Sequence, residues 1–328
     1  MCIRDRYNAN SVRLTNVGEK REVEYKELNN NEQEMEPFTE TPSNEKTYEE
    51  NINEILEMSN EEIRALLKEQ NIYLTDEEIL KFKEEVKAEF SHPIKINFFG
   101  GFIISLFLLA LAYKDAPRLY YSLFYAALGL QTIFTLYVIS FWIDEKFDIA
   151  TLNPAWFIPV VGNLLIPIIA EKSQAIWYYF SLGLFFWIIL FAVIFYRLVF
   201  CDKLADKFVP TLVITLAPPA MAFLGYVKLT EQFDAFAAIL LNINVFFAAL
   251  ILFSYKRFIK LKFALSWWAF TFPTAASSIA FLKAYEITQS DFYLVLGVGA
   301  FAVLVASILI VGFLTVKSII NGEIFSEK

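Results

Sequence analysis

Long apolar stretches separated by short charged breaks fill the chain from Ile96 almost to its end. We count eight of them, at about 96–113, 118–143, 154–170, 175–200, 209–228, 233–256, 264–283 and 292–317. Each is about 17 to 26 residues long, the length of a helix that crosses a bilayer, in some cases with a tilt. A membrane β-barrel would instead show shorter segments of alternating hydrophobicity. The pattern therefore predicts an all-α polytopic membrane protein with eight transmembrane helices.

The first part of the chain has a different composition from the rest. Residues 1–90 carry 23 acids and 12 bases, a net charge of −11. Residues 91–328 carry 13 acids and 16 bases, a net charge of +3, and the two parts add up to the overall −8. We therefore divide the chain into an acidic segment, 1–90, and a transmembrane domain, 91–328.

The acidic segment carries signals for disorder and for two short helices. Up to about Thr47 it is rich in Asn, Glu, Thr and Pro, so we expect this part to be disordered. Two capping boxes each precede a thin apolar stripe and predict the two helices, Ser59 with Glu62 and Thr75 with Glu78. The segment holds no apolar span, so we expect it to be an appendage outside the membrane.

Basic residues in the breaks predict the orientation. One side holds eleven of them, Lys95, Lys146, Arg197, Lys203, Lys207, Lys256, Arg257, Lys260, Lys262, Lys317 and Lys328. The other side holds five, Lys114, Arg118, Lys172, Lys228 and Lys283. Loops rich in Lys and Arg stay in the cytoplasm. We therefore expect a multi-pass protein of the cell membrane whose N-terminal segment and C-terminus are both cytoplasmic.

Prolines divide the eight stretches into two classes. They fall inside the third stretch (Pro154, Pro159, Pro167), the fifth (Pro210, Pro218, Pro219) and the seventh (Pro273), and Pro93 opens the first. The second, fourth, sixth and eighth contain none in their interiors. A kinked helix needs partners for its freed carbonyl groups, which it finds beside other helices or a water-filled path. The alternation therefore predicts an inner ring of kinked helices around a pore and an outer ring of straight ones.

The stretch at 264–283 concentrates these features. It holds the bulky side chains of Phe270 and Phe272, then Pro273, then a run of small residues that includes Ser277. Small residues let another backbone or a solute come close. The stretch can accordingly be read as a pore-lining helix or as a proline-kinked packing helix.

Polar groups within the stretches are neutral. No Asp, Glu, His, Lys or Arg lies near the middle of any of them, whereas proton-coupled transporters usually carry ionisable residues there. Asn163 could hydrogen-bond a neighbouring helix or line a pore. The candidates for pore lining are Asn97, Pro159, Asn163, Pro218, Phe270, Pro273 and Ser277.

Motifs for chemistry are missing from the sequence. It has no nucleotide-binding loop, nucleophile elbow or zinc-protease motif, and the single histidine, His92, excludes a zinc site built on histidines. We therefore predict no enzymatic activity, no cofactor, no metal site and no nucleic-acid partner.

Four segments of the chain stand out as motifs: EEVKAEFSHPIKINFF (84–99), NPAWFIPVVGNL (153–164), LAPPAMAFLGY (216–226) and WWAFTFPTAASSIAFLKAYE (267–286). In sequence and in order they resemble the tellurite-resistance/dicarboxylate transporter family, which includes the plant slow-type anion channels. The resemblance implies a homotrimer in which each subunit has ten helices in five hairpins, odd helices inside and even ones outside. It also implies that Phe272 is the gate.

The chain departs from the family pattern by one hairpin. It has eight stretches, and the hairpin that is missing corresponds to the family's first. The opening residues, Met1–Arg6, bear no relation to the acidic segment after them, which favours a missing true start. The alternative is that the protein is not a complete pore.

The resemblance implies transport of small inorganic or organic anions. A passive anion channel or facilitator is the first interpretation, because a neutral path can select anions through helix dipoles and hydrogen-bond donors. A coupled exporter of sulfite, dicarboxylate or related anions is the alternative. A membrane-embedded enzyme is the third, and the missing acid, base and metal groups argue against it.

Overall fold

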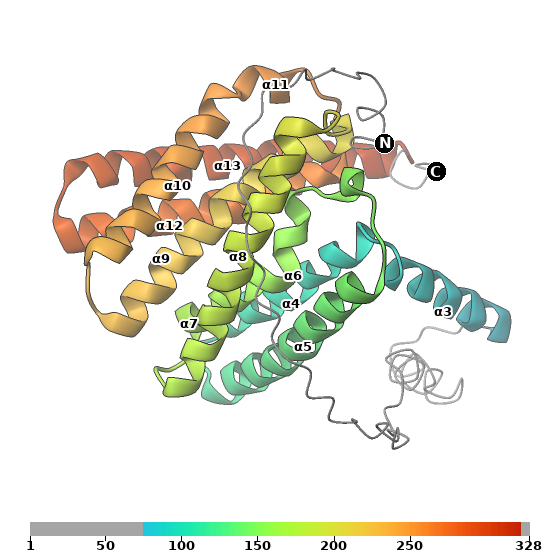
Figure 1. The fold of residues 1–328 in the computed structure, drawn as a ribbon, viewed down its shortest axis with the longest axis horizontal. Helices are drawn as coiled ribbons and strands as arrows, with labels where there is room; N and C mark the ends of the chain where they lie inside the picture. The colour runs from blue at the N-terminus through green and yellow to red at the C-terminus, as the bar shows by residue number, and fades with distance from the viewer. Residues whose placement is uncertain (1–74, 323–328) are drawn as a thin grey trace, which may run out of the picture. The chain divides into compact units, whose positions relative to one another are not determined.

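The structure is a computed structural model, and it describes residues 75–322, part of a compact unit formed by Thr75–Lys328. Every regular element within these residues is helical (Figure 1). In chain order they are α3 (Asp76–Phe90), α4 (Lys95–Ala112), α5 (Pro117–Asp144), η1 (Ile149–Thr151), η2 (Pro154–Phe157), α6 (Ile158–Val161), η3 (Gly162–Leu164), α7 (Leu165–Ile169), α8 (Gln174–Phe200), η4 (Asp206–Leu216), α9 (Ala217–Thr230), α10 (Ala235–Phe253), α11 (Tyr255–Ile259), η5 (Leu265–Phe270), α12 (Thr271–Thr288) and α13 (Asp291–Ile320), where η marks a 3-10 helix. The all-α membrane class predicted from the sequence is confirmed.

The number of spans differs from the prediction. Within residues 75–322, six helical segments are long and apolar enough to cross a membrane, so the predicted count of eight is not confirmed. The third predicted stretch is a succession of four short pieces between Pro154 and Ile169. The seventh is divided between η5 and α12. In both places proline limits the length of a single α-helix, because it lacks an N–H and its ring clashes with the preceding turn.

From the second stretch onward, straight and broken helices alternate as the prolines predict, whereas the first stretch departs from the predicted alternation. The second, fourth, sixth and eighth predicted stretches form single uninterrupted α-helices, α5, α8, α10 and α13. The third, fifth and seventh are each interrupted by 3-10 turns, which are common where a helix ends or changes direction. The first stretch, α4, is unbroken because Pro93 lies before the helix begins.

Consecutive helices pair into hairpins, and the broken helices form an inner layer. α4 packs with α5, α9 with α10, and α12 with α13, while α6 and α7 pack with α8. Inner contacts then run from α4 to α6 and α7, from α7 to α9, and from α9 to α12. No comparable contact joins α12 back to α4 among the described residues. The inner layer is therefore an open arc (Figure 1).

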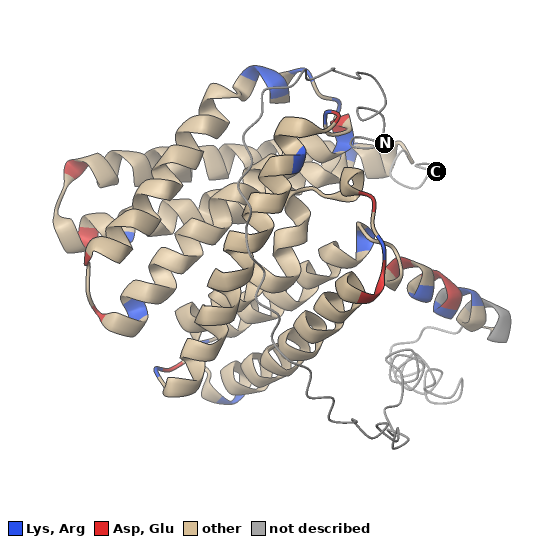
Figure 2. Ribbon diagram, viewed as in Figure 1, with Lys and Arg blue, Asp and Glu red and all other residues tan. Residues whose placement is uncertain are grey.

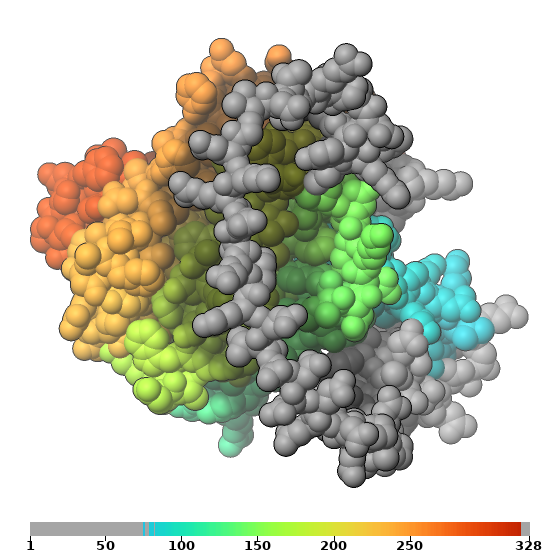
Figure 3. Space-filling model, in the orientation of Figure 1, coloured from blue at the N-terminus to red at the C-terminus, as the bar shows by residue number. Residues whose placement is uncertain are grey.

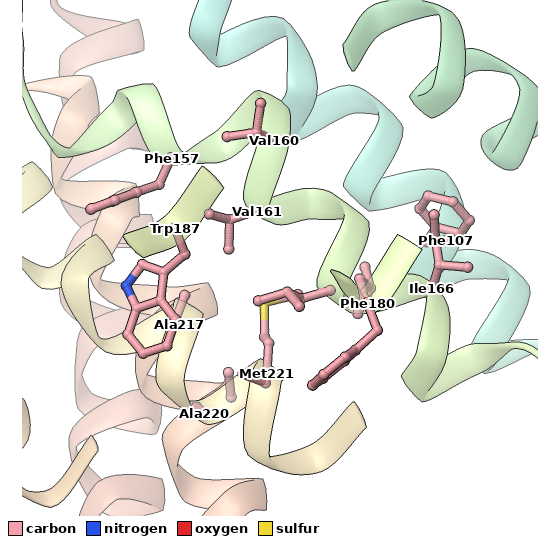
Figure 4. Packing of buried hydrophobic residues seen from close by; sticks show 14 of the residues in the cluster. Phe107, Phe157, Val160, Val161, Ile166, Phe180, Trp187, Ala217, Ala220 and Met221 are labelled. Atoms are coloured by element: carbon pink, nitrogen blue, oxygen red, sulfur yellow. The ribbon is translucent and has the colours of Figure 1, made fainter. Parts of the chain in front are cut away.

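Burial differs most strongly between the η4–α9 segment and α13. In the most apolar window of Asp206–Thr230, 83% of the residues are buried, against 11% in that of α13. The close-up in Figure 4 shows inner residues such as Val161, Ala217 and Met221 facing one another across α6 and α9, with Trp187 of α8 beside them. In the space-filling view the α9–α10 and α12–α13 ends, gold and orange-red, lie side by side (Figure 3). The apolar surface of α13 thus faces outward, as expected for a helix that contacts lipid.

Two glycines allow straight helices to approach their inner neighbours closely. A Cβ atom at Gly183 of α8 would lie 2.8 Å from Cγ of Leu164, and one at Gly297 of α13 would lie 2.7 Å from Cδ2 of Leu282. Real Cβ atoms do not come this close to other atoms, so any larger residue would push the helices apart. Gly129 of α5 has open space around it.

The helix predicted after Thr75 is present as α3. It docks on α4 through Phe90, whose ring lies 4.4 Å from that of Phe99. The helix predicted after Ser59 and the disorder predicted up to Thr47 lie outside the described residues.

Candidate functional site

The breaks in the inner helices define the candidate site. Pro159, Pro218 and Pro273 are all buried, and each lies in the first turn of the α-helical piece that follows a 3-10 segment. The missing N–H of proline costs little there, because first-turn N–H groups have no partner within the helix. The prolines therefore mark where each inner helix starts again.

Side chains from the straight helices satisfy carbonyl groups at two breaks. Gln131 of α5 donates from Nε2 to the carbonyl oxygen of Pro159 at 2.7 Å, and the Thr135 hydroxyl donates to the same oxygen at 3.2 Å. Asn244 of α10 donates from Nδ2 to the carbonyl oxygen of Leu216 at 3.2 Å, immediately before the α9 break. Inside a bilayer such partners are needed, because no bulk water can reach the carbonyls.

Asn163 belongs to the same polar cluster. Its Nδ2 donates to the Thr135 hydroxyl at 2.9 Å and to the carbonyl oxygen of Val160 at 2.9 Å. The side chain is fully buried, and its Oδ1 accepts no hydrogen bond from any described residue. The bond to α5 is the one that the helix-packing interpretation expects, and pore lining by Asn163 stays a prediction.

Phe270 and Phe272 lie on either side of the break between η5 and α12. Phe272 is partly exposed and packs against the main apolar core. Phe270 packs in a separate cluster, where its ring lies 5.1 Å from Phe258 and 5.6 Å from Trp267. The structure thus gives the two phenylalanines different surroundings although they are two residues apart.

The small residues after Pro273 are buried. Ser278 donates from Oγ to the carbonyl oxygen of Gly297 on α13 at 2.9 Å. Ser277 is 1% exposed, and its hydroxyl has no hydrogen-bond partner in the described part of the chain. Asn97 of α4 is also buried, and its Nδ2 donates to the carbonyl oxygen of Pro93 at 2.8 Å. These polar groups lie within packed surroundings in the conformation described.

Charged residues gather at the ends of the helices (Figure 2). Lys172 and Glu231 form an ion pair that joins the loop after α7 to the start of the α9–α10 loop. The hydrogen bond from Lys172 holds the pKa of Glu231 below its usual value. The pKa of Asp234 is also lowered, first by the hydrogen bond from the Tyr226 hydroxyl and then by the backbone N–H of Ala237.

Some polar residues at the site were not predicted from the sequence. Thr135 was not among the candidates, although it joins Gln131, Asn163 and the Pro159 carbonyl. The spacing could have indicated this contact, because Gln131 and Thr135 are four residues apart and share one face of α5. In the described residues no three His, Cys, Asp or Glu side chains come close enough to hold a metal ion.

Comparison with known proteins decides the family. Residues 74–316 match the family described as voltage-dependent anion channel, which is most of the chain. The chain belongs to this family. The match confirms the resemblance noted in the sequence, and it begins just before α3 and ends within α13.

Several members of the voltage-dependent anion channel family resemble the chain along most of its length. The S-type anion channel SLAH3 of Arabidopsis thaliana is 27% identical over 276 residues, 81% of this chain and 42% of that protein. The S-type anion channel SLAH2 of the same plant is 26% identical over 253 residues, 74% of this chain and 49% of that protein. An uncharacterized transporter of Methanocaldococcus jannaschii is 24% identical over 283 residues, 76% of this chain and 81% of that protein. The chain therefore spans less than half the length of the two plant relatives.

Proposed function

We propose that the protein is a passive channel or facilitator for small inorganic or organic anions. The observation that carries this proposal is the match of residues 74–316 to the voltage-dependent anion channel family. Two of the relatives are named S-type anion channels. No enzymatic role is proposed, because the family consists of channels and transporters.

The anion path runs along the arc of broken helices. Helix ends inside a membrane present unpaired N–H groups and the positive end of a helix dipole, which favour an anion without a fixed charge. We place such ends at the changes from 3-10 to α-helix near Pro159, Pro218 and Pro273 in the inner layer. The residues proposed to line the path are Asn97, Pro159, Asn163, Pro218, Phe270, Pro273 and Ser277.

Phe272 is proposed as the gate of this path. It lies in the first turn of α12, directly after the break and directly before the buried Pro273. A phenylalanine ring at a constriction excludes water and ions together, which makes a hydrophobic gate. Phe272 is partly exposed, and its ring packs against the main apolar core rather than in the cluster that holds Phe270.

The test compares Phe272→Ala with Phe270→Ala by anion current at equal surface expression. Opening a gate raises the current per molecule, so Phe272→Ala should exceed wild type. Phe270→Ala removes a ring that packs on Phe258 and Trp267, so it should lower the amount of folded protein and should not raise the current per molecule. Unchanged or reduced current in a well-folded Phe272→Ala protein would refute the gate.

A coupled exporter is the second candidate, because one relative is named a transporter. The two mechanisms differ in their response to a proton gradient. Flux through a channel follows the anion gradient alone, whereas a proton-coupled exporter also responds to pH across the membrane. Anion flux from proteoliposomes, measured with and without a pH gradient at constant membrane potential, separates them.

The assembly is proposed by analogy with the family. We propose a homotrimer in the cell membrane with the acidic segment and the C-terminus in the cytoplasm, and a further helical hairpin that closes the arc between α12 and α4. The open arc and the excess of basic residues at one end of the bundle support this arrangement. Sequencing an intact locus tests the hairpin, and light scattering of the purified protein tests the trimer.

A further inference from the structure

A second polar site lies at the C-terminal ends of α8 and α10. A cavity of about 250 Å³ opens there, beside the first part of the η4–α9 segment. Phe191 and Phe247 form part of its wall, with ring centroids 5.4 Å apart. Three cations line it, Arg197, Lys203 and Arg257, and no acidic residue of the described chain does.

Arg197 is the unusual group in this cavity. Its side chain is 4% exposed, and its Nε and Nη1 atoms have no hydrogen-bond partner in the described part of the chain. Its single hydrogen bond runs from Nη2 to the carbonyl oxygen of Ala150 at 3.5 Å, the outer limit for such a contact. A buried guanidinium that lacks an acid is strongly unfavourable unless an anion joins it.

Helix electrostatics alone do not account for Arg197. It lies in the last turn of α8, where a cation interacts favourably with the helix dipole. That attraction is several times smaller than the penalty for burying a charge with unpaired N–H groups. Asp202 and Asp206 are near in sequence, but neither lines the cavity, and among residues 75–322 neither forms an ion pair.

The walls of the cavity identify the kind of anion. Apart from the cations, most of its lining is apolar, and Phe195, Val199 and Leu250 are at least 39% exposed on the outer faces of α8 and α10. These outer faces belong to the layer that contacts lipid. Basic residues lie at the same end of the bundle on α11, as Figure 2 shows. An anion that fits has a compact charged group and an apolar tail that leaves toward the bilayer.

We propose that this cavity binds the phosphate group of an anionic phospholipid. Arg197 donates to the phosphate oxygens from Nε and Nη1, and Lys203 and Arg257 add positive charge at the mouth. An acyl chain runs along Phe195, Val199 and Leu250. Basic pockets between transmembrane helices are suited to such head groups. Because η4 forms the floor through Val209, Leu212 and Thr215, a bound lipid would brace one of the broken helices.

The test measures lipid binding to the purified full chain in neutral detergent by native mass spectrometry. Phosphatidylglycerol should bind wild type more tightly than phosphatidylcholine does. Arg197→Gln should weaken phosphatidylglycerol binding about ten- to hundredfold, and Arg257→Gln about fivefold. Lys256→Gln is the matched control, because Lys256 is also exposed on α11 but does not line the cavity, and it should bind as wild type.

Three outcomes would overturn the proposal. The first is equal binding of the two lipids, and the second is equal binding by Arg257→Gln and Lys256→Gln. The third is stabilisation of wild type by inorganic phosphate alone with no added effect of phosphatidylglycerol, which would assign the cavity to a soluble anion. Arg257 lies at the exposed mouth, so its variant remains informative if Arg197→Gln does not fold.

Discussion

The straight helix α10 and the broken segment η4–α9 are neighbours in one hairpin, yet they are built in opposite ways. α10 contains no proline, turns several large apolar side chains outward, and buries one narrow face. The η4–α9 segment contains three prolines, and 83% of the residues in its most apolar window are buried. The straight helix can therefore face lipid, because all its backbone groups bond internally. The broken one depends on its neighbours, as the bond from Asn244 to the Leu216 carbonyl illustrates.

The largest difference between the layers should appear on truncating a phenylalanine. Phe223 of α9 is 0% exposed, whereas Phe301 of α13 is 55% exposed. Phe223→Ala should lower the free energy of unfolding by about 3–5 kcal/mol, as in other packed cores. Phe301→Ala should change it by less than about 1 kcal/mol, because few contacts are lost. Denaturant unfolding in mixed micelles measures both, and similar losses would contradict the division into layers.

Close contact between the layers can be tested at glycine. Gly183→Ala places a methyl group 2.8 Å from Leu164 Cγ and 3.1 Å from its backbone N, so α8 must move away from the broken segment. Overpacking should lower the free energy of unfolding by about 1–3 kcal/mol. The higher helix propensity of alanine offsets roughly 1 kcal/mol of this loss. The control, Gly129→Ala on α5, has open space and should be neutral or slightly stabilising. Thermal unfolding of the two variants measures both effects, and equal unfolding midpoints would contradict the close contact at Gly183.

Hydrogen bonding to a break should contribute less than packing. Asn244→Leu removes the bond to the Leu216 carbonyl and should cost about 0.6–1.7 kcal/mol, the range for hydrogen bonds between membrane helices. Asn242 lies two residues earlier on α10, is exposed, and bonds only to the Ala238 carbonyl of its own helix. Asn242→Leu should therefore be neutral. Equal effects would show that the break does not depend on α10.

The smallest effect should come from the loops that tie the layers together at one end. The pKa of Glu231 is lowered by Lys172, so the pair stabilises the fold above the unfolded-state pKa of about 4.3 and loses its effect as pH falls through the lower folded-state value. Glu231→Gln should flatten, without abolishing, the fall of the unfolding midpoint between about pH 5 and pH 3. Some acid sensitivity remains because Asp234 titrates in the same direction.

Local sequence was sufficient for the class of the protein and for the division between straight and broken helices. A bilayer demands long apolar helices, and proline breaks a helix by itself, so neither property requires knowledge of distant residues. The four uninterrupted helices and the three broken ones appear where the prolines place them. The count of eight spans is not confirmed, because apolar length does not reveal that Pro154–Ile169 divides into four short pieces.

Tertiary structure alone decided which polar residues meet. Gln131 reaches the Pro159 carbonyl from 28 residues away, and Asn244 reaches the Leu216 carbonyl across the same separation. Arg197 looked like one more basic residue at a helix end, and only the packing of α8, η4 and α10 encloses it in a cavity without an acid. These contacts depend on how whole helices pack, since the hydrogen bonds and the burial of a residue are determined by neighbours that are distant in sequence.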